Sequence, residues 1–154
     1  MRPDDPAAVS AIGHAMVARI ATLSRTGRPH VNPLYFVYHS GTIYLGTTDR
    51  TLAARNVAAN PRVSLLFTAD GAEPGQSLLR VRGNARLRVE PDLFRWYARR
   101  DTRKYILTLP GLVDMVRHAR LLPVMRHYLA AGDKGRRCVI EVQPTDAEFL
   151  ASPG

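Results

Sequence analysis

The chain of 154 residues is poor in features that cross-link or anchor a protein. Its one cysteine, Cys138, excludes an internal disulfide and a cysteine-rich metal site. No stretch approaches the roughly 20 consecutive apolar residues that span a bilayer. The first six residues hold two aspartates and two prolines, and so lack the basic-then-apolar order of a signal peptide. We therefore expect one cytoplasmic domain, residues 1–154, without a membrane partner.

Familiar catalytic signatures are missing as well. The sequence has no Walker loop, no GxGxxG after a strand, no GxSxG and no HExxH. Tyr35, Tyr38 and His39 could each donate a proton, but each suits an ordinary strand equally well, so we assign no catalytic residue. No metal site is predicted either, because no two histidines have the close spacing of metal ligands. The five histidines are His14, His30, His39, His118 and His127.

Lysine is scarce whereas arginine is abundant. The chain carries 22 basic against 13 acidic side chains, a formal charge of +9, and only Lys104 and Lys134 are lysines. Guanidinium groups bind phosphate and carboxylate through paired hydrogen bonds. The composition therefore indicates an anionic partner, and charge alone does not choose among nucleic acid, an anionic membrane and a small anionic molecule.

The hydrophobic pattern of the first 50 residues predicts a helix and then an antiparallel meander. Apolar residues at helical spacing indicate a helix over Asp5–Ile20, and from Arg19 the period changes to that of a strand. Three short strands should follow, over residues 20–24, 30–38 and 42–47, with glycine-containing turns between them.

The rest of the chain predicts three more strands and a helical insert. Residues 50–59 have helical composition and stop at Asn60–Pro61, because proline disfavours a helical residue before it. Strands are expected at 62–68, at 77–89 beyond a loop, and at 137–142, while 91–137 form a basic insert of two or three helices. This order predicts a mainly β, α+β domain: a six-stranded antiparallel barrel whose helical insert precedes the last strand.

Several segments occur in the order typical of one known superfamily. They are G-x-P-H-V-x-P-L at Gly27–Leu34, an apolar strand ending in threonines at Ile43–Thr48, R-N-V-A-A-N-P-R-V-S-L-L at Arg55–Leu66, V-R-G-N-A-R-L at Val81–Leu87, and Pro144 followed by Glu148-Phe149. Over about residues 14–90 and 138–150 the chain resembles the flavin-binding split-barrel superfamily, which contains pyridoxamine 5′-phosphate oxidases and deazaflavin-dependent reductases.

The resemblance implies a split β-barrel, a homodimer with the pocket between subunits, and an oxidoreductase. Its cofactor would be F420 or FMN, which exchanges a hydride with a small organic substrate. In similar proteins one strand lies against the flavin ring, while threonines and a helix N-terminus hold the ribityl phosphate. The residues thereby assigned to the cofactor are His30, Val31, Asn32, Pro33, Leu34, Thr47, Thr48, Arg50, Thr51, Arg55 and Asn56. Taken without the resemblance, 47–51 would be an ordinary turn with a helix cap.

The sequence departs from the superfamily pattern at two places. Leu52-Ala53 stand where members with tightly bound cofactor often carry Arg-Lys or Lys, so Arg50 and Arg55 would have to replace the phosphate clamp. Leu150 stands where tryptophan is common, and the substrate-binding arginine and histidine of the oxidases do not follow it. True pyridoxamine-phosphate oxidase activity is therefore not expected.

The basic insert has two interpretations. Its aromatic residues either pack the helices onto the barrel or stack on a ligand. In the second case the arginine-rich cluster suits the anionic oligoglutamate tail of F420, which favours F420 over FMN. The cluster comprises Arg95, Arg99, Arg100, Arg103 and Lys104.

Two other classes stay open at this point. A non-catalytic split barrel that binds haem or another planar anion would use the same cleft, with His30 or His118 as an iron ligand. A nucleic-acid-binding barrel would use the arginine-rich insert, but it should expose aromatic residues on its strands. Most aromatic residues in this pattern fall at buried positions, so nucleic acid is not an expected partner.

Overall fold

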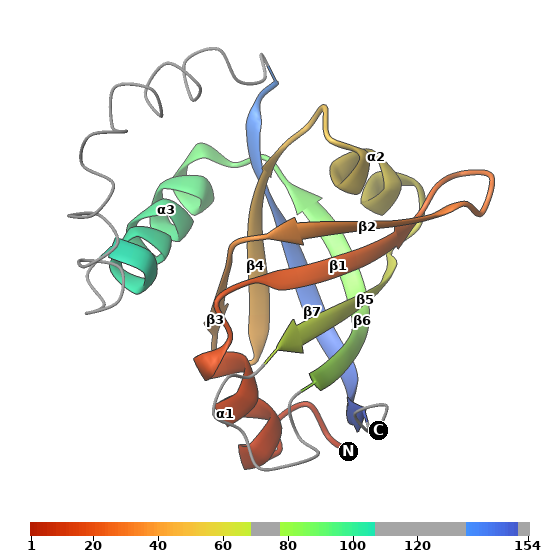
Figure 1. The fold of residues 1–154 in the computed structure, drawn as a ribbon. Helices are drawn as coiled ribbons and strands as arrows, with labels where there is room; N and C mark the ends of the chain where they lie inside the picture. The colour runs from red at the N-terminus through yellow and green to blue at the C-terminus, as the bar shows by residue number, and fades with distance from the viewer. Residues whose placement is uncertain (69–77, 107–134, 151–154) are drawn as a thin grey trace, which may run out of the picture.

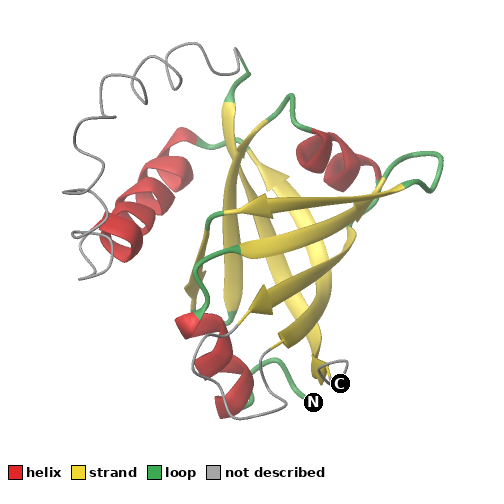
Figure 2. Ribbon diagram, viewed as in Figure 1, coloured by secondary structure: helices red, strands yellow, loops and turns green. Residues whose placement is uncertain are grey.

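The computed structural model describes residues 1–68, 78–106 and 135–150. Its elements are α1 (Pro6–His14), β1 (Ala18–Leu23), β2 (Pro29–Leu34), β3 (Phe36–His39), β4 (Thr42–Thr48), α2 (Leu52–Ala59), β5 (Arg62–Thr68), β6 (Leu78–Arg88), α3 (Pro91–Ile106) and β7 (Arg137–Leu150). The expected loop at 69–76 and the part of the insert from 107 to 134 lie outside the described residues. The α+β architecture is confirmed (Figures 1 and 2).

All strands belong to one curled antiparallel sheet, in the order β2-β1-β5-β6-β7-β4-β3. The expected count of six strands is wrong, because the predicted strand 30–38 divides at Tyr35. Residues before Tyr35 pair with β1, and residues after it pair with β4. The chain therefore passes directly from one edge of the sheet to the other, which is possible only because the sheet curls upon itself (Figure 1).

The first helix is shorter than predicted. Asp5 caps α1, because its carboxylate accepts the amide of Ala7, and Pro6 occupies the first helical position. The helix ends at His14 rather than at Ile20. From Ala18 onward the buried residues alternate with more exposed ones, so pairing with β2 and β5 takes priority over helical spacing.

The last strand is longer than predicted. It continues past the expected end at Val142 to Leu150, and it pairs with β4 over its first half and with β6 along nearly its whole length. A bulge at Thr145 shifts the register, since Arg82 faces Asp146 whereas the next residue, Gly83, faces Pro144. Bulges accommodate a proline that cannot donate to the ladder. This is why a polar, proline-containing segment still forms a strand.

The core fills the inside of the curled sheet, and the helices close its openings. Phe36 and Phe67 meet there edge to face, with ring centroids 5.0 Å apart. Helices α1 and α2 lie at opposite ends of the sheet, and α3 packs on the outside against β3, β4 and β7 (Figure 1). Among the described residues, no helix has the length and apolar character needed to cross a membrane.

Candidate functional site

The strand predicted to face a cofactor ring is an edge of the sheet. Among the strands that the structure describes, β2 pairs only with β1, and its side chains alternate between exposed and half-buried. Pro29, Val31 and Pro33 point outward, while His30, Asn32 and Leu34 are half-buried. Proline is tolerated in an edge strand where its missing N–H would face away from the neighbour. Successive residues of an antiparallel strand direct their backbone groups alternately toward and away from the neighbouring strand. Val31, which lies between Pro29 and Pro33 at the same spacing, therefore directs its backbone groups to the open edge as well.

Asn32 carries an unsatisfied polar atom in this strand. Its side-chain oxygen is buried and has no hydrogen-bond partner among the described residues. A buried acceptor without a donor costs about 1–3 kcal/mol, so such atoms are rare unless a ligand or water completes them. The Asn32 oxygen therefore offers an acceptor for an N–H group on a bound molecule.

The end of β4 and the start of α2 form a hydroxyl-lined turn. The Thr51 hydroxyl lies 2.8 Å from the Thr47 hydroxyl, donates to the Thr48 carbonyl at 3.0 Å and accepts the amide of Ala54 at 3.3 Å. Thr51 is thus the N-cap of α2. A helix start leaves several amides without intrahelical partners, here those of the two residues after the cap. The turn combines two hydroxyl groups with free amides, a set that suits an anion.

The cations around this turn differ from the predicted pair. Arg50 is exposed next to the turn, but the Arg55 side chain lines a separate shallow cavity with Arg25. Instead, residue Arg136 is brought to the turn from the start of β7: its amide donates to the Asp49 carboxylate at 2.9 Å, and the Asp49 amide donates to its carbonyl at 2.9 Å. A role for Arg136 was missed because only the β4–β7 pairing brings it here.

Asn56 has a structural role within α2. Its side-chain amide donates to the Thr22 hydroxyl of β1 at 3.0 Å, and both side chains are buried. The bond fixes the helix across the end of the sheet. A cofactor contact by Asn56 remains only a prediction, and the observed bond already uses its nitrogen.

Helix α3 fastens the corner at which the chain leaves one sheet edge for the other. The Tyr97 hydroxyl donates to the Tyr35 carbonyl at 3.2 Å, and the Lys104 ammonium lies 3.4 Å from the Phe36 carbonyl and 3.3 Å from the centre of the Phe36 ring. The Tyr105 hydroxyl also contacts the Phe36 backbone. Because pairing partners change at this corner, its backbone groups need such side chains. These three residues pack α3 onto the barrel, as the first interpretation requires of the aromatic residues Tyr97 and Tyr105.

Burial shifts the pKa values of the groups at this corner. Desolvation lowers the pKa of Lys104 to about 8, although the nearby Asp101 carboxylate opposes the shift. Desolvation, assisted by Asp101, raises the pKa of Tyr97, and it raises that of Tyr105 as well. Burial also raises the pKa of Cys138, on β7, to about 11. The phenols and the thiol therefore stay protonated at neutral pH, and the thiol is a poor nucleophile.

The excess positive charge is unevenly distributed. On the outer face of β6, arginines alternate with other residues and pair with acids of β7, so that Arg80 bonds Glu148 at 2.5 Å and Arg82 bonds Asp146 at 2.7 Å. Glu141, whose side chain is 6% exposed, accepts from both Arg86 and Arg88 at 2.7 Å. This ladder neutralises the β6 arginines. The described arginines without an ion pair lie elsewhere, and three of them, Arg99, Arg100 and Arg103, share α3.

Comparisons with known proteins agree with this architecture. The family model described as "Pyridoxamine 5'-phosphate oxidase" matches residues 5–151. General stress protein 26 of Bacillus subtilis is 29% identical over 82 residues, which is 53% of this chain and 58% of that protein. The chain thus matches less than two-thirds of the length of this relative.

Two solved structures illustrate the range of proteins that share the fold. One is an F420 reductase, with a TM-score of 0.63 and 23% identity, covering 92% of this chain and 95% of that one. The other is HutZ, the haem storage protein of Vibrio cholerae, with a TM-score of 0.55 and 18% identity, covering 97% of this chain and 96% of that one. At these identities the likeness shows the fold alone.

Proposed function

Since the chain belongs to the pyridoxamine 5′-phosphate oxidase family, we propose that it binds a phosphorylated flavin or deazaflavin and acts as an oxidoreductase on a small organic substrate. The observation that carries this proposal is the hydroxyl-lined turn at the start of α2, with Thr47 and Thr51 bonded at 2.8 Å and the exposed Arg50 beside them. When bound, the cofactor supplies hydride transfer, and the protein supplies position and hydrogen bonds.

The residues of this chain fit such a group in two places. Thr47, Thr51 and the first amides of α2 would hold the phosphate, with Arg50 adding positive charge, while Arg136 offsets the Asp49 carboxylate, 3.7 Å from its guanidinium. The unpaired oxygen of Asn32 and the open edge of β2 would bind the polar edge of the ring. His30, Pro33 and Leu34 would shape the surface beneath it, as the family resemblance implies.

We favour F420 over FMN for two reasons. Leu52-Ala53 replace the cationic pair that often clamps phosphate in the family, and Ala53 is buried. The protein therefore presents less positive charge to the phosphate at this place. In addition, the uncompensated arginines of α3 create a positive field that favours the coenzyme with more negative charges. True pyridoxamine-phosphate oxidase activity is not proposed.

The proposed site is completed by a second copy of the chain. Large apolar side chains are exposed around the turn and the edge strand, with Val31 62%, Tyr35 58% and Leu52 45% exposed. Exposed apolar side chains that cluster beside a polar site indicate a protein interface. We expect a homodimer by light scattering after gel filtration, and a monomer with weakened cofactor binding for Val31→Asp. A wild-type monomer would contradict this arrangement.

Titration of the purified protein with F420 and with FMN tests the cofactor directly. Quenching of cofactor fluorescence at micromolar concentrations is expected, with F420 the tighter ligand. Arg50→Gln should weaken binding about tenfold, because a charge-assisted contact to phosphate is lost. Arg62→Gln is the matched control: it removes the same charge from an exposed position on β5 and should leave the affinity unchanged. If neither cofactor binds, or if both variants behave alike, the proposed site is wrong.

The alternative, a non-catalytic haem-binding split barrel, is tested in the same experiment. His30 is half-buried on β2, whereas His118 lies outside the described residues. A sharp Soret band on adding haem, lost in His30→Ala, would support this function in place of the oxidoreductase.

A further inference from the structure

A basic surface that the proposed cofactor site does not use lies around the turn between β1 and β2 and the last part of α2. Arg25 of this turn and Arg55 of α2 line one shallow hollow of about 570 Å³, together with Ala58 and Ala59. Figure 1 shows the turn extending beyond the sheet on the side of α2, away from α3. The structure thus brings together two guanidinium groups that are distant in the sequence.

Two further arginines belong to the same end of the sheet. Arg28 closes the turn that carries Arg25, and Arg62 begins β5. Arg62 lines a neighbouring groove with Leu23 and Pro29, the two residues that pair at the base of this turn. We call the four exposed side chains the turn patch: Arg25, Arg28, Arg55 and Arg62.

No acidic side chain of the described residues compensates the turn patch. Between Asp5 and Asp70 the sequence has a single acid, Asp49, against six arginines. Asp49 is already engaged, because it accepts the amide of Arg136 and lies 3.7 Å from the guanidinium of that residue. None of the four arginines of the turn patch forms an ion pair with any residue that the structure describes. Like charges held together without counter-charges favour an anionic partner.

The turn presents its two arginines on a fixed backbone. The Ser24 amide donates to the Arg28 carbonyl at 2.9 Å, and the Ser24 carbonyl accepts the amide of Gly27 at 3.0 Å. The Ser24 hydroxyl also accepts the Arg28 amide at 3.0 Å, and Gly27 supplies the positive φ that the turn requires. A preformed backbone reduces the entropy that would be lost when this surface binds a partner.

The surroundings of the turn patch separate the kinds of anionic partner. Protein interfaces and membrane-bound surfaces depend on large apolar or aromatic side chains at their centre. None of the exposed large apolar side chains of the described residues lines the hollow or the neighbouring groove; they are Met1, Met16, Val31, Tyr35, Leu52 and Val89. The turn patch therefore suits a partner that is recognised through its charge, as the phosphate backbone of a nucleic acid is.

A duplex fits this surface better than a single strand does. Proteins that hold single strands stack the bases on aromatic side chains, and no aromatic residue that the structure describes lines the hollow or the groove. The lack of exposed strand aromatics, which argued against a nucleic-acid partner from the sequence, therefore does not apply to a duplex bound through its backbone. Double-stranded DNA carries one phosphate per about 1.7 Å of its axis, so separated arginines can each contact one.

We propose that the turn patch is a binding surface for the phosphate backbone of a nucleic-acid duplex, without preference for base sequence. Arg25 and Arg55 bind phosphates at the hollow that they share, and Arg28 and Arg62 add contacts next to it. This gives Arg55 a role outside the cofactor site. The inference does not rest on the proposed oxidoreductase function, because the turn patch shares no residue with β2, with the hydroxyl-lined turn or with the proposed dimer interface.

Fluorescence anisotropy of a labelled DNA duplex of about 20 base pairs measures this interaction with the full chain. We expect a micromolar Kd at 50 mM salt, equal for two unrelated duplex sequences. Four phosphate contacts predict a slope of log K against log salt of about −3.6, so the affinity should fall about 100-fold between 50 and 200 mM salt. A single strand of the same length should bind more weakly, because its charge density is lower and the turn patch offers no stacking.

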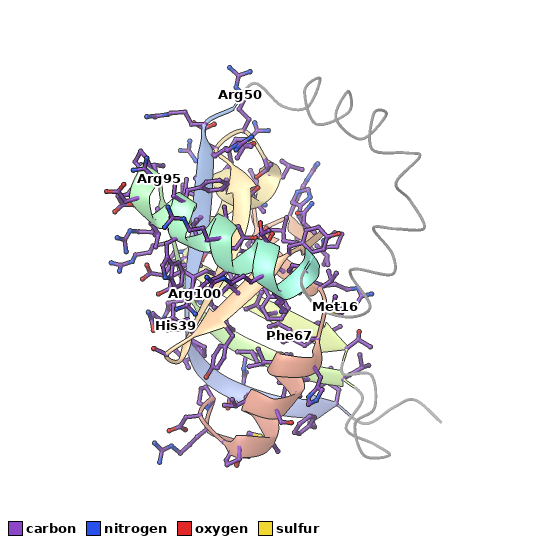
Figure 3. The ribbon with its side chains drawn as sticks, turned by 90° about the vertical axis from the view of Figure 1, so that its left-hand side faces the viewer. Met16, His39, Arg50, Phe67, Arg95 and Arg100 are labelled. Atoms are coloured by element: carbon purple, nitrogen blue, oxygen red, sulfur yellow. The ribbon has the colours of Figure 1, made fainter. Side chains whose placement is uncertain are left out.

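The arginines of α3 provide a control at a different place on the molecule. Figure 3 shows Arg95 and Arg100 projecting from α3 on the side of His39, whereas Arg50, just before α2, projects at the end of the barrel that carries α2. The α3 arginines therefore report on net charge without belonging to the turn patch.

Matched double variants separate the turn patch from net charge. Arg25→Gln with Arg55→Gln removes two phosphate contacts, so the slope should become shallower by about 1.8 and the affinity at 50 mM salt should fall about tenfold or more. Arg99→Gln with Arg103→Gln removes the same charge from exposed positions on α3 and should leave the slope unchanged. The Arg25 and Arg55 double variant should bind F420 or FMN like the wild type. Failure of both cofactors to bind, with duplex binding intact, would refute the cofactor proposal alone.

Four results would overturn the proposal. Absence of duplex binding at 50 mM salt would remove the surface altogether. Equal losses in the two double variants would mean that only net charge matters. Equal or tighter binding of the single strand would exclude recognition of a duplex. Tighter binding of polyglutamate, a model of an acidic protein, or of vesicles containing phosphatidylserine would assign the turn patch to a different partner.

Discussion

Gly46→Ala tests the docking of α3 on the barrel. Gly46 lies on β4 directly beneath Tyr97, and a Cβ added there would sit 2.4 Å from the Tyr97 Cε1 atom. Ordinary contact requires about 3.4 Å or more, so the ring must move by roughly 1 Å. Tyr97 is 5% exposed, and its hydroxyl is bonded to the Tyr35 carbonyl, so it has little room to move.

The cost of this substitution follows from these contacts. Overpacking a well-packed site costs about 1–3 kcal/mol. Displacing the Tyr97 hydroxyl from the Tyr35 carbonyl adds about 1 kcal/mol. We therefore expect Gly46→Ala to lower the free energy of unfolding by about 2–4 kcal/mol in urea titrations followed by far-ultraviolet circular dichroism. The emission of Trp96, one residue away from Tyr97, should change in the native state as α3 shifts.

Two controls make the result decisive. Gly13→Ala adds a methyl group in α1 where nothing lies within 4 Å, and it should stabilise the protein by about 0.5–1 kcal/mol because alanine favours a helix. In a Tyr97→Leu background the clash disappears, so Gly46→Ala should then cost less than about 0.5 kcal/mol. The same cost in both backgrounds, or no cost in the wild type, would refute the docking of Tyr97 onto Gly46.

Three further substitutions test buried polar groups. The pKa of Lys104 is lowered to about 8 in the folded protein, so between pH 8 and the pKa of an unfolded lysine the unfolded chain binds more protons and stability rises with pH. From pH 7 to 9 the free energy of unfolding of the wild type should therefore gain about 1 kcal/mol relative to Lys104→Met in urea titrations. Equal pH profiles for the two proteins would contradict this. Glu141→Gln leaves Arg86 and Arg88 without their shared carboxylate and should lower the free energy of unfolding by about 1–3 kcal/mol. Calorimetric melting would detect this loss, and an unchanged Tm would show that the two ion pairs contribute nothing. Asn56→Ala removes the buried hydrogen bond to Thr22 and should lower the free energy of unfolding by about 1–3 kcal/mol. Arg55→Ala, an exposed change on the same helix, is the control, and an equal loss of stability in both variants would contradict the prediction.

Much of the local structure was predictable because it depends on near neighbours in the chain. The alternation of apolar residues and arginines along β6 identified a strand with one buried face, as observed. Asn60–Pro61 ended α2 at the predicted place. The glycine turns were also correct, since Gly27 and Gly41 adopt positive φ values of 82° and 79°. The ordered motifs were sufficient to identify the family.

Other features depended on which strands become neighbours. The division of the predicted strand at Tyr35 follows from its two sheet partners, and no local signal marks it. The polar residues after Val142 do not have the pattern of a strand, and they form one because they pair with residues of β6. The same holds for Arg136, which reaches the turn after β4 only through β7.

The sequence by itself determined the place of most strands, the glycine turns, the end of α2, the family and the excess of positive charge. Only the tertiary structure decided where that charge is free. It pairs the arginines of β6 with acids more than 50 residues away, turns Lys104 onto the ring of Phe36, and leaves Arg99, Arg100 and Arg103 without acidic partners among the described residues. The physical reason is that a charge is compensated or exposed according to its neighbours in space, and sheet register, rather than sequence distance, sets those neighbours.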